Sequence, residues 1–311
     1  SVPALAPVAW NLVIIAALLF LTPLFEGQDR VYAYAIGVLV GTVVQFLLPI
    51  PWLRGRGGRF SIALDWRNEH VRRVLWLMLP VTLALGMINL SLLINSLFGT
   101  LVSDAAPAAI DKAFRIYQLP QGLFSISIAT VLFPTLSKLA ARGANDDLRS
   151  TMSNGVRQIC LLLIPSGVLM AVLAEPIVRL LYQRGEFGPE ATDLVTTALI
   201  WCSISLPFQG VSLLFSRTFF GLQQPWATTA LAVVNMVVNA AVAFALYKPL
   251  GIAGIVIGTV AGTLVMTVAQ GWILRGELGG IEGRKLVGAI MRMLAAAAVL
   301  AAFAYGVWYG L

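Results

Sequence analysis

Long uninterrupted runs of apolar residues constrain this chain more than any other feature. A helix that crosses a lipid bilayer needs about 20 largely apolar residues. Nine segments meet that length: 4–24, 32–53, 74–102, 108–136, 155–181, 191–219, 226–247, 251–274 and 286–310. Only 11% of the 311 residues are charged, against roughly 25% in soluble domains. The chain is therefore predicted to be an all-α, polytopic membrane protein with about nine transmembrane helices.

The basic residues are distributed unevenly between the two sides of this predicted topology. Fifteen of the 21 lysines and arginines lie within or at the edges of the connectors after the second, fourth, sixth and eighth helices, and four lie on the other side. Since loops rich in Lys and Arg stay in the cytoplasm, we expect the N-terminus of the chain inside and its C-terminus outside. Topology then accounts for the net charge of +7, which gives no reason to predict a nucleic-acid partner.

One predicted span contains charged residues, which are energetically unfavourable inside a bilayer. In the segment 108–136, the polar or small residues Asp111, Arg115, Gln118, Gly122 and Ser125 recur at helical spacing and form one stripe. Charges at the centre of a membrane cost roughly 2.5–3.5 kcal/mol each and mark functional positions by default. The stripe is expected to face a polar cavity or another helix, with a kink at Pro120.

A structural alternative stays open for the two basic residues of this span. Lys112 and Arg115 could lie near the outer surface and extend to water, with Asp111 as a local partner of Arg115. Lys112 lies off the stripe and fits this alternative better than Arg115 does.

Several uncharged polar residues also fall inside the predicted spans, namely Asn11, Asn89, Asn95, Asn235, Asn239 and Thr259. Amide and hydroxyl oxygens can ligate a hard cation such as sodium. They also join neighbouring membrane helices by hydrogen bonds worth ~0.6 kcal/mol each, and the absence of a carboxylate from the set favours this second interpretation.

The sequence gives little reason to predict an enzyme. Cys160 and Cys202 both lie in apolar runs, and the one histidine, His70, lies in a charged connector. Most acidic residues lie in connectors, without a recognised catalytic spacing. We therefore expect transport and no covalent chemistry.

Two adjoining stretches resemble the signature of a known family. Residues 113–124 read AFRIYQLPQGLF and residues 125–137 read SISIATVLFPTLS. Further matches are PALAPVAWNLVII at 3–15, YQRGEF at 182–187 and LGIAG at 250–254. Together they resemble the MurJ (MviN) family of bacterial lipid II flippases, which belongs to the multidrug/oligosaccharidyl-lipid/polysaccharide exporter superfamily.

This resemblance implies a two-lobed transporter of about fourteen spans, of which the chain would begin at the fifth. Residues 1–53 would be the last two helices of the N-lobe, and 54–73 a cytoplasmic amphipathic connector. Residues 74–275 would be the six-helix C-lobe, and 276–311 one additional transmembrane helix. The family's first four helices, which carry most of its cavity arginines, would be missing.

The resemblance also implies roles for particular residues. Arg115 falls on the family's cavity arginine that is expected to meet the lipid II pyrophosphate. Phe114 stands where the family often has Asp, so Asp111 would supply the carboxylate, and Asn11 matches a polar cavity position. The sodium site of some members would map to Asn95, Asn235, Asn239 and Thr259, but the acidic ligands expected at positions 95 and 239 are amides here.

The function implied is the flipping of lipid II, the undecaprenyl-pyrophosphate-linked muropeptide, across the bacterial cytoplasmic membrane by alternating access of two lobes. Membrane lipids would be its other partners, and sodium coupling is doubtful. The rivals are another exporter of the superfamily, for drugs or a different polyprenyl-linked glycan, and a membrane scaffold of cell-wall synthesis that does not transport.

Overall fold

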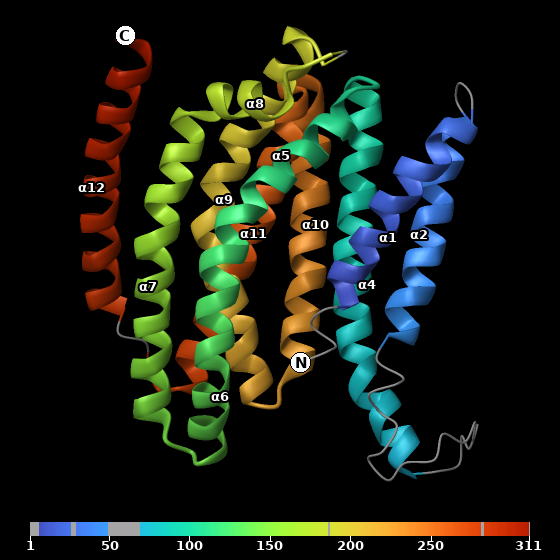
Figure 1. The fold of residues 1–311 in the computed structure, drawn as a ribbon. Helices are drawn as coiled ribbons and strands as arrows, with labels where there is room; N and C mark the ends of the chain where they lie inside the picture. The colour runs from blue at the N-terminus through green and yellow to red at the C-terminus, as the bar shows by residue number, and fades with distance from the viewer. Residues whose placement is uncertain (1–5, 26–28, 49–68, 186, 281–282, 311) are drawn as a thin grey trace. The chain divides into compact units, whose positions relative to one another are not determined.

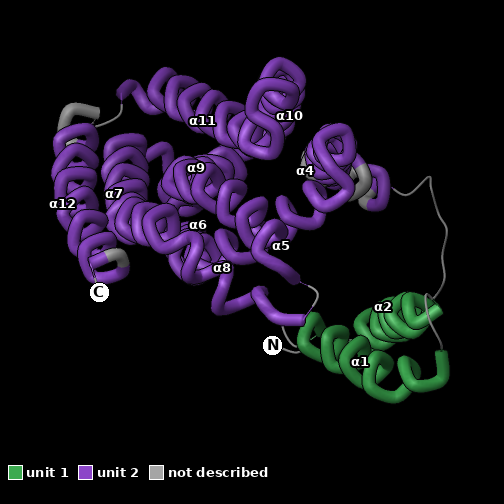
Figure 2. Tube along the Cα trace, turned by 90° about the horizontal axis from the view of Figure 1, so that it is seen from above, with its two compact units in different colours: residues 1–68 green, residues 69–311 purple. Residues whose placement is uncertain are grey.

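The computed structural model describes residues 6–25, 29–48, 69–185, 187–280 and 283–310 (Figure 1). The chain divides into two compact units, residues 1–68 and 69–311 (Figure 2). Every regular element among the described residues is helical, which agrees with the all-α prediction. Each unit is described below by itself.

The first unit contains a pair of helices, α1 (Ala6–Leu21) and α2 (Arg30–Leu47), with the short turn η2 (Thr22–Leu24) between them. The two helices approach closely because α2 presents glycines to α1. An ideal Cβ at Gly37 would lie 2.9 Å from Cβ of Ala17, and one at Gly41 would lie 3.2 Å from the carbonyl oxygen of Trp10. The Trp10 indole also donates a hydrogen bond of 3.4 Å to Oγ1 of Thr42.

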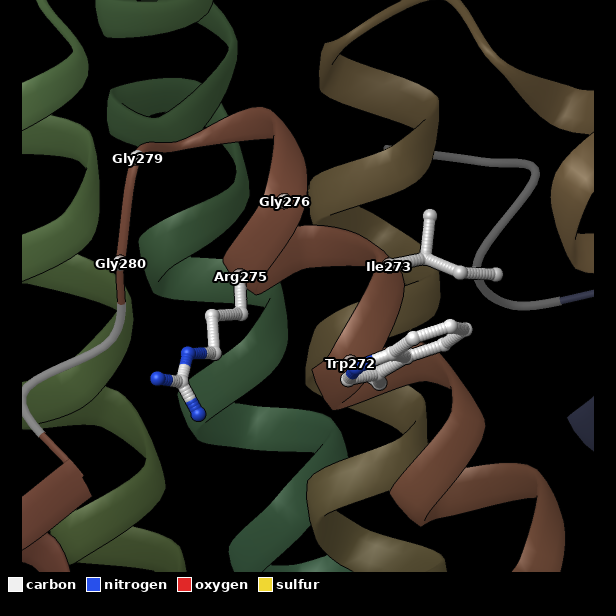
Figure 3. A pocket seen from close by; sticks show the side chains of 6 residues that line it. All are labelled: Trp272, Ile273, Arg275, Gly276, Gly279 and Gly280. Carbon is white, nitrogen blue, oxygen red and sulfur yellow. The ribbon is translucent and has the colours of Figure 1, made fainter.

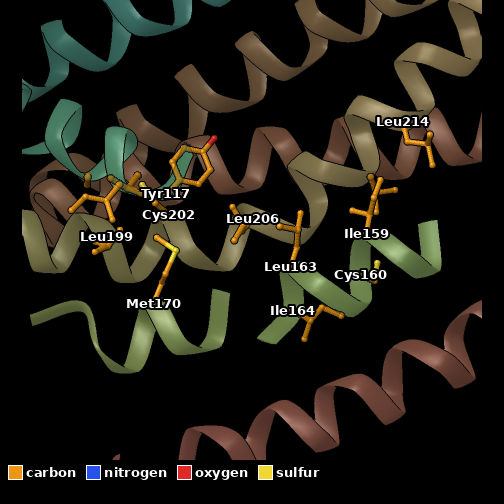
Figure 4. Packing of buried hydrophobic residues seen from close by; sticks show 14 of the residues in the cluster. Tyr117, Ile159, Cys160, Leu163, Ile164, Met170, Leu199, Cys202, Leu206 and Leu214 are labelled. Atoms are coloured by element: carbon orange, nitrogen blue, oxygen red, sulfur yellow. The ribbon is translucent and has the colours of Figure 1, made fainter. Parts of the chain in front are cut away.

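The second unit is a helical bundle built around one long central helix. Its elements are α4 (Glu69–Val102), α5 (Ala106–Pro120), the π-helical turn η4 (Gln121–Ile126), α6 (Ser127–Ala141), α7 (Asn145–Val172), α8 (Ala174–Tyr182), α9 (Pro189–Gly221), α10 (Pro225–Leu250), α11 (Ile252–Glu277) and α12 (Gly283–Tyr309). Helix α9 packs against α5, α6, α7, α8 and α11. Leu163 of α7 and Leu199, Leu206 and Leu214 of α9 are fully buried in the resulting core (Figure 4).

Among the described residues, eight helices are long and apolar enough to cross a membrane, which confirms the prediction of a polytopic membrane protein. The remaining predicted span, 74–102, lies within α4. Within α4, the residues Asn89–Val102 form a shorter apolar segment.

One span predicted from the sequence is wrong. The segment 155–181 is not one span, because α7 ends at Val172 and α8 runs across the end of the bundle (Figure 1). The break falls at Leu173, whose φ of −98° and ψ of 21° leave the helical region. The predicted connector 54–73 lies outside the described residues up to residue 68, and residues 69–73 already belong to α4.

Aromatic pairs near the two ends of α4 and α10 indicate where the membrane surfaces lie. At one end Trp76 contacts Trp226, with ring centroids 6.0 Å apart, and at the α8 end Phe98 contacts Tyr247 at 5.7 Å. Trp226 and Tyr247 are 21 residues apart on α10, which corresponds to about 32 Å of helix. Because this matches a hydrocarbon core of about 30 Å and aromatic rings favour membrane interfaces, the two pairs mark its boundaries.

Helices α10 and α11 are in backbone contact through glycines spaced four residues apart. An ideal Cβ at Gly258 would lie 2.8 Å from the carbonyl oxygen of Asn239, and one at Gly262 would lie 2.7 Å from that of Asn235. Gly254 is equally close to Leu246. Small residues at this spacing let membrane helices approach at short range, so α10 and α11 form a tightly packed hairpin.

Candidate functional site

The charged part of the predicted stripe lies on an exposed face of α5. Nε of Arg115 donates to Oδ2 of Asp111 at 2.8 Å, and the side chains are 70% and 60% exposed within the unit. Gln118, one turn further, is also exposed. The opposite face of α5 is buried in the core through Ala109, Ile110, Ala113, Ile116 and Tyr117. This packing fixes the helix so that Asp111, Arg115 and Gln118 point away from the core.

The position of Arg115 along the membrane normal follows from the helix connections. Pro107 at the start of α5 lies level with Gly99 of α4, because an ideal Cβ at Gly99 would be 3.0 Å from Cγ of Pro107. Gly99 follows Phe98, which belongs to the aromatic pair at the α8 end. Arg115 lies eight residues beyond Pro107, up to about 12 Å further along the helix axis. The position of Arg115 inside the hydrocarbon layer stays a prediction.

The prediction of one continuous stripe is wrong at Ser125. That residue is fully buried, and its Oγ lies 2.5 Å from the place of an ideal Cβ at Gly210 on α9. The π-helical turn η4 follows Pro120 directly, and a π turn contains more residues than an α turn. Ser125 lies within this turn and points toward α9, and the expected kink appears as a change of direction between α5 and α6 (Figure 1).

Asn11 lies on α1 in the first unit, whereas Arg115 lies in the second. Its amide Nδ2 donates to the carbonyl oxygen of Pro7 at 2.9 Å, and the side chain is exposed within its unit. Its predicted role beside Arg115 stays a prediction.

The four residues of the expected sodium site lie on three helices that pack together, α4, α10 and α11. Nδ2 of Asn95 donates to Oγ1 of Thr259 at 3.1 Å. Nδ2 of Asn235 contacts Sδ of Met266 at 3.6 Å, and the Asn235 and Asn239 backbones lie against Gly262 and Gly258. The structure thus gathers the four residues around one stretch of α11.

Two amide oxygens in this cluster are buried without a hydrogen-bond donor among the described residues. They are Oδ1 of Asn95 and Oδ1 of Asn239, whose residues are only 4% and 1% exposed. No group of three or more His, Cys, Asp or Glu that could hold a metal occurs in the described part of the chain. The cluster therefore offers neutral oxygens, and its chemistry differs from that of a carboxylate cation site.

The sequence did not reveal two further polar groupings. Between α9 and α11, Thr263 donates to Gln209 at 3.3 Å, Thr267 to the Phe208 carbonyl at 3.1 Å, and Gln270 to Ser216 at 3.0 Å. The helical spacing of Thr263, Thr267 and Gln270 along α11 is a sequence signal that could have indicated the first grouping. The second is Lys112 beside the rings of Tyr182 and Phe187. Helical spacing contains no signal for this contact, because the partners lie on separate elements.

Two cavities of the second unit lie away from Arg115. One, of about 520 Å³, lies where α11 turns toward α12. Arg275 extends beside the Gly279–Gly280 connector there, and Trp272 and Ile273 project to the other side of α11 (Figure 3). The other, of about 510 Å³, is apolar and lies between α7, α9, α11 and α12. The Asp111–Arg115 pair lines neither cavity and instead occupies an open helix face.

Comparison of the sequence with known proteins points to one family. The family model for the lipid II flippase MurJ matches residues 1–311. A probable lipid II flippase MurJ of Rhizobium meliloti is 33% identical over 310 residues, which cover 97% of this chain and 56% of the relative. One of Bdellovibrio bacteriovorus is 27% identical over 298 residues, 96% of this chain and 57% of the relative. The chain thus spans a little over half the length of these two relatives.

Solved structures agree on the fold. A lipid II flippase MurJ in an inward closed conformation aligns with a TM-score of 0.76 at 20% identity, covering 96% of this chain and 60% of that one. An inward-facing multidrug resistance transporter of the MATE family aligns with a TM-score of 0.72 at 17% identity, covering 88% and 63%. The match of the family model over the whole sequence decides between these two groups, and the chain belongs to the lipid II flippase MurJ family.

Proposed function

We propose that this chain takes part in moving lipid II from the inner to the outer leaflet of the bacterial cytoplasmic membrane. The observation that carries the proposal is the Asp111–Arg115 pair on an exposed face of a membrane helix. Asp111 already pairs with Nε of Arg115, and an exposed guanidinium can donate further charge-assisted hydrogen bonds to a second anion, such as the pyrophosphate of lipid II. The names of the relatives point to the same substrate. The chain is a multi-pass membrane protein, and its activity as a flippase is proposed for the full two-lobed transporter.

In this mechanism the protein forms and breaks no covalent bond. Arg115 holds the pyrophosphate by charge-assisted, bidentate hydrogen bonds. Asp111 orients the guanidinium while the site is empty, since it already accepts from Nε. Gln118 offers an amide to the polar head group, and a contact of Asn11 with it stays a prediction. Two lobes that rock about a midplane site then expose it to each leaflet in turn.

The proposed orientation has the N-terminus in the cytoplasm and the C-terminus outside. Its support is the concentration of basic residues at the end of the second unit opposite α8. Lys138 and Arg275 lie there in the last turns of α6 and α11, Arg142 directly follows α6, Arg217 lies near the end of α9 and Arg149 near the start of α7. Because positive charge is retained in the cytoplasm, α8 lies at the outer surface. The basic residues thereby serve topology, and no nucleic-acid partner is proposed.

A chimera tests the function directly. Residues 1–311 would replace the matching region of the Rhizobium meliloti relative, in cells depleted of their own flippase. We expect growth to be restored and lipid II to become accessible to an externally added enzyme that cleaves its head group. A chimera that reaches the membrane at normal level without exposing lipid II would contradict the proposal and favour another exported substrate. Growth without exposed lipid II would indicate a scaffold.

The α4–α10–α11 cluster does not fit a sodium site that drives this transport. Asn95, Asn239 and Thr259 present neutral oxygens only, and one lone pair of Thr259 already accepts from Asn95. A cation there would keep its full charge in a low-dielectric environment, which is unfavourable without a carboxylate. We propose that the cluster joins the three helices by hydrogen bonds and that transport does not depend on sodium.

Thermal unfolding in sodium and in potassium tests this proposal. Ligand at a hundred times its Kd stabilises a protein by about 2.7 kcal/mol, so a sodium site would be visible as a higher unfolding temperature in sodium. We expect no difference for the natural sequence, and a sodium-dependent increase for the Asn239→Asp variant, which adds the missing carboxylate. Sodium stabilisation of the natural sequence that disappears in Asn239→Ala would show that the cluster binds the ion after all.

A further inference from the structure

Because Lys112 lies off the polar stripe, its side chain was expected to extend to water. In the structure it contacts two aromatic rings instead. Its Nζ lies 5.5 Å from the ring centroid of Phe187 and 5.9 Å from that of Tyr182. The two rings are 5.9 Å apart, so one ammonium group contacts both. These distances are within the range of cation–π attraction, which strengthens where water is excluded. Lys112 is half-buried, so its charge is directed to the rings.

The two rings belong to the two ends of one connecting segment. Tyr182 is the last residue of α8, and Phe187 lies two residues before α9 begins at Pro189. Between them, Nη2 of Arg184 donates to the carbonyl oxygen of Leu180 at 3.2 Å, and Gly185 turns the chain at a φ of +60°. Arg184 is thus held against the end of α8 by a local bond. Both rings also pack against the core of the bundle.

Lys112 connects this segment to the part of α5 that carries the charged pair. It follows Asp111 directly and precedes Arg115 by three residues, so one helical turn contains all three. Residues three apart are neighbours on a helix surface, so Lys112 lies beside Arg115, and its contacts with the two rings direct its charge away from the guanidinium. Lys112 can therefore hold the segment while Asp111 and Arg115 remain on the exposed face.

We propose that Lys112 is a positioning residue for the anion site on α5. Its contacts with Tyr182 and Phe187 attach these two residues to α5 and hold the turn that carries Asp111 and Arg115 in place. They also keep a second positive charge off the face of Arg115. The attachment stands on the structure alone, whereas the positioning role rests on the proposed function.

Trypsin cleavage after Arg184 measures the attachment. The variants are Lys112→Met, which keeps the length and removes the charge, and Lys112→Arg, which keeps cation–π attraction. We expect cleavage at Arg184 to be on the order of tenfold faster in Lys112→Met and near the natural rate in Lys112→Arg. Phe187→Leu should behave as Lys112→Met does. The matched control is Lys248→Met, because Nζ of Lys248 lies 5.9 Å from the ring of its own neighbour Tyr247 and joins no second element.

Binding of inorganic pyrophosphate by the same variants measures the positioning. We expect a several-fold higher Kd for Lys112→Met, restored by Lys112→Arg, and no change for Lys248→Met. Unchanged cleavage at Arg184 in Lys112→Met would overturn the attachment, and with it the proposal. Faster cleavage with unchanged pyrophosphate affinity would overturn the positioning role, provided that Arg115→Ala does weaken binding. If Arg115→Ala leaves pyrophosphate binding unchanged, the anion site itself is wrong and the proposed function fails.

Discussion

Arg115→Ala is expected to abolish lipid II translocation by the chimera while its amount in the membrane stays normal. In a low-dielectric site, removal of one partner of a charge pair leaves the other uncompensated, at a cost of about 3–5 kcal/mol. That corresponds to roughly two to three orders of magnitude in affinity. The protein itself should tolerate the change, because the side chain is 70% exposed within its unit and fills no part of the core. Exposure of lipid II and the protein level are measured together.

Two further variants, Arg115→Lys and Arg179→Ala, are the controls for this experiment. Lysine keeps the charge and loses the planar fork of the guanidinium, so Arg115→Lys should retain part of the activity. Arg179→Ala removes an arginine from an ion pair of the same spacing, with Glu175 at 2.7 Å on α8, and should leave translocation nearly unchanged. Normal translocation by Arg115→Ala would contradict the anion site and favour the alternative that Arg115 extends to water at the membrane surface.

Gly258→Leu is expected to prevent the second unit from folding, and Gly258→Ala to destabilise it by about 1–3 kcal/mol, as overpacking does. An ideal Cβ at this position would lie 2.8 Å from the carbonyl oxygen of Asn239 and 2.9 Å from the amide nitrogen of Ala243. Both are backbone atoms of α10, so a side-chain rotation cannot relieve the clash. Thermal unfolding of the purified variants gives the destabilisation.

Gly276→Ala is the matched control, because it lies in the same helix and a Cβ there would meet nothing within 4 Å. Alanine favours a helix over glycine by up to about 1 kcal/mol, so this variant should be as stable as the natural sequence or slightly more so. Equal stability of Gly258→Ala and Gly276→Ala would contradict the close approach of α10 and α11.

The sequence was sufficient for the membrane-spanning architecture, because the length and polarity of apolar runs are local properties. It failed at Leu173, where the chain turns from α7 into α8 without a proline, a glycine or a charge at that position. The local signal comes two and three residues later, at Glu175 and Pro176, and the high average hydropathy of 155–181 conceals it. The predicted start at 155 also differs from that of α7 at Asn145, since a helix can extend beyond the bilayer into water.

The charged pair of the candidate site was predictable, and its surroundings were not. Asp111 and Arg115 are four residues apart, and helical spacing alone brings them together. The burial of Ser125 depends on the π turn, which an analysis with 3.6 residues per turn cannot anticipate. The contact of Lys112 with Phe187 joins residues 75 positions apart, and nothing local encodes it. Asn11 and Arg115 belong to different units, so their proposed cooperation stays a prediction.

The π turn at Gln121–Ile126 has a consequence for alignments of this region. A π turn holds one more residue than a helix of regular hydrogen bonding would place there. Deleting one residue from it would restore an ordinary α-helix and rotate everything on one side by about 100° relative to the other. The direction in which Arg115 points relative to α6 is therefore encoded in the number of residues in this turn as well as in their identity. When two sequences differ by a one-residue gap in this turn, the residues aligned on one side of it lie on different helix faces in the two proteins, even if the residues themselves are identical.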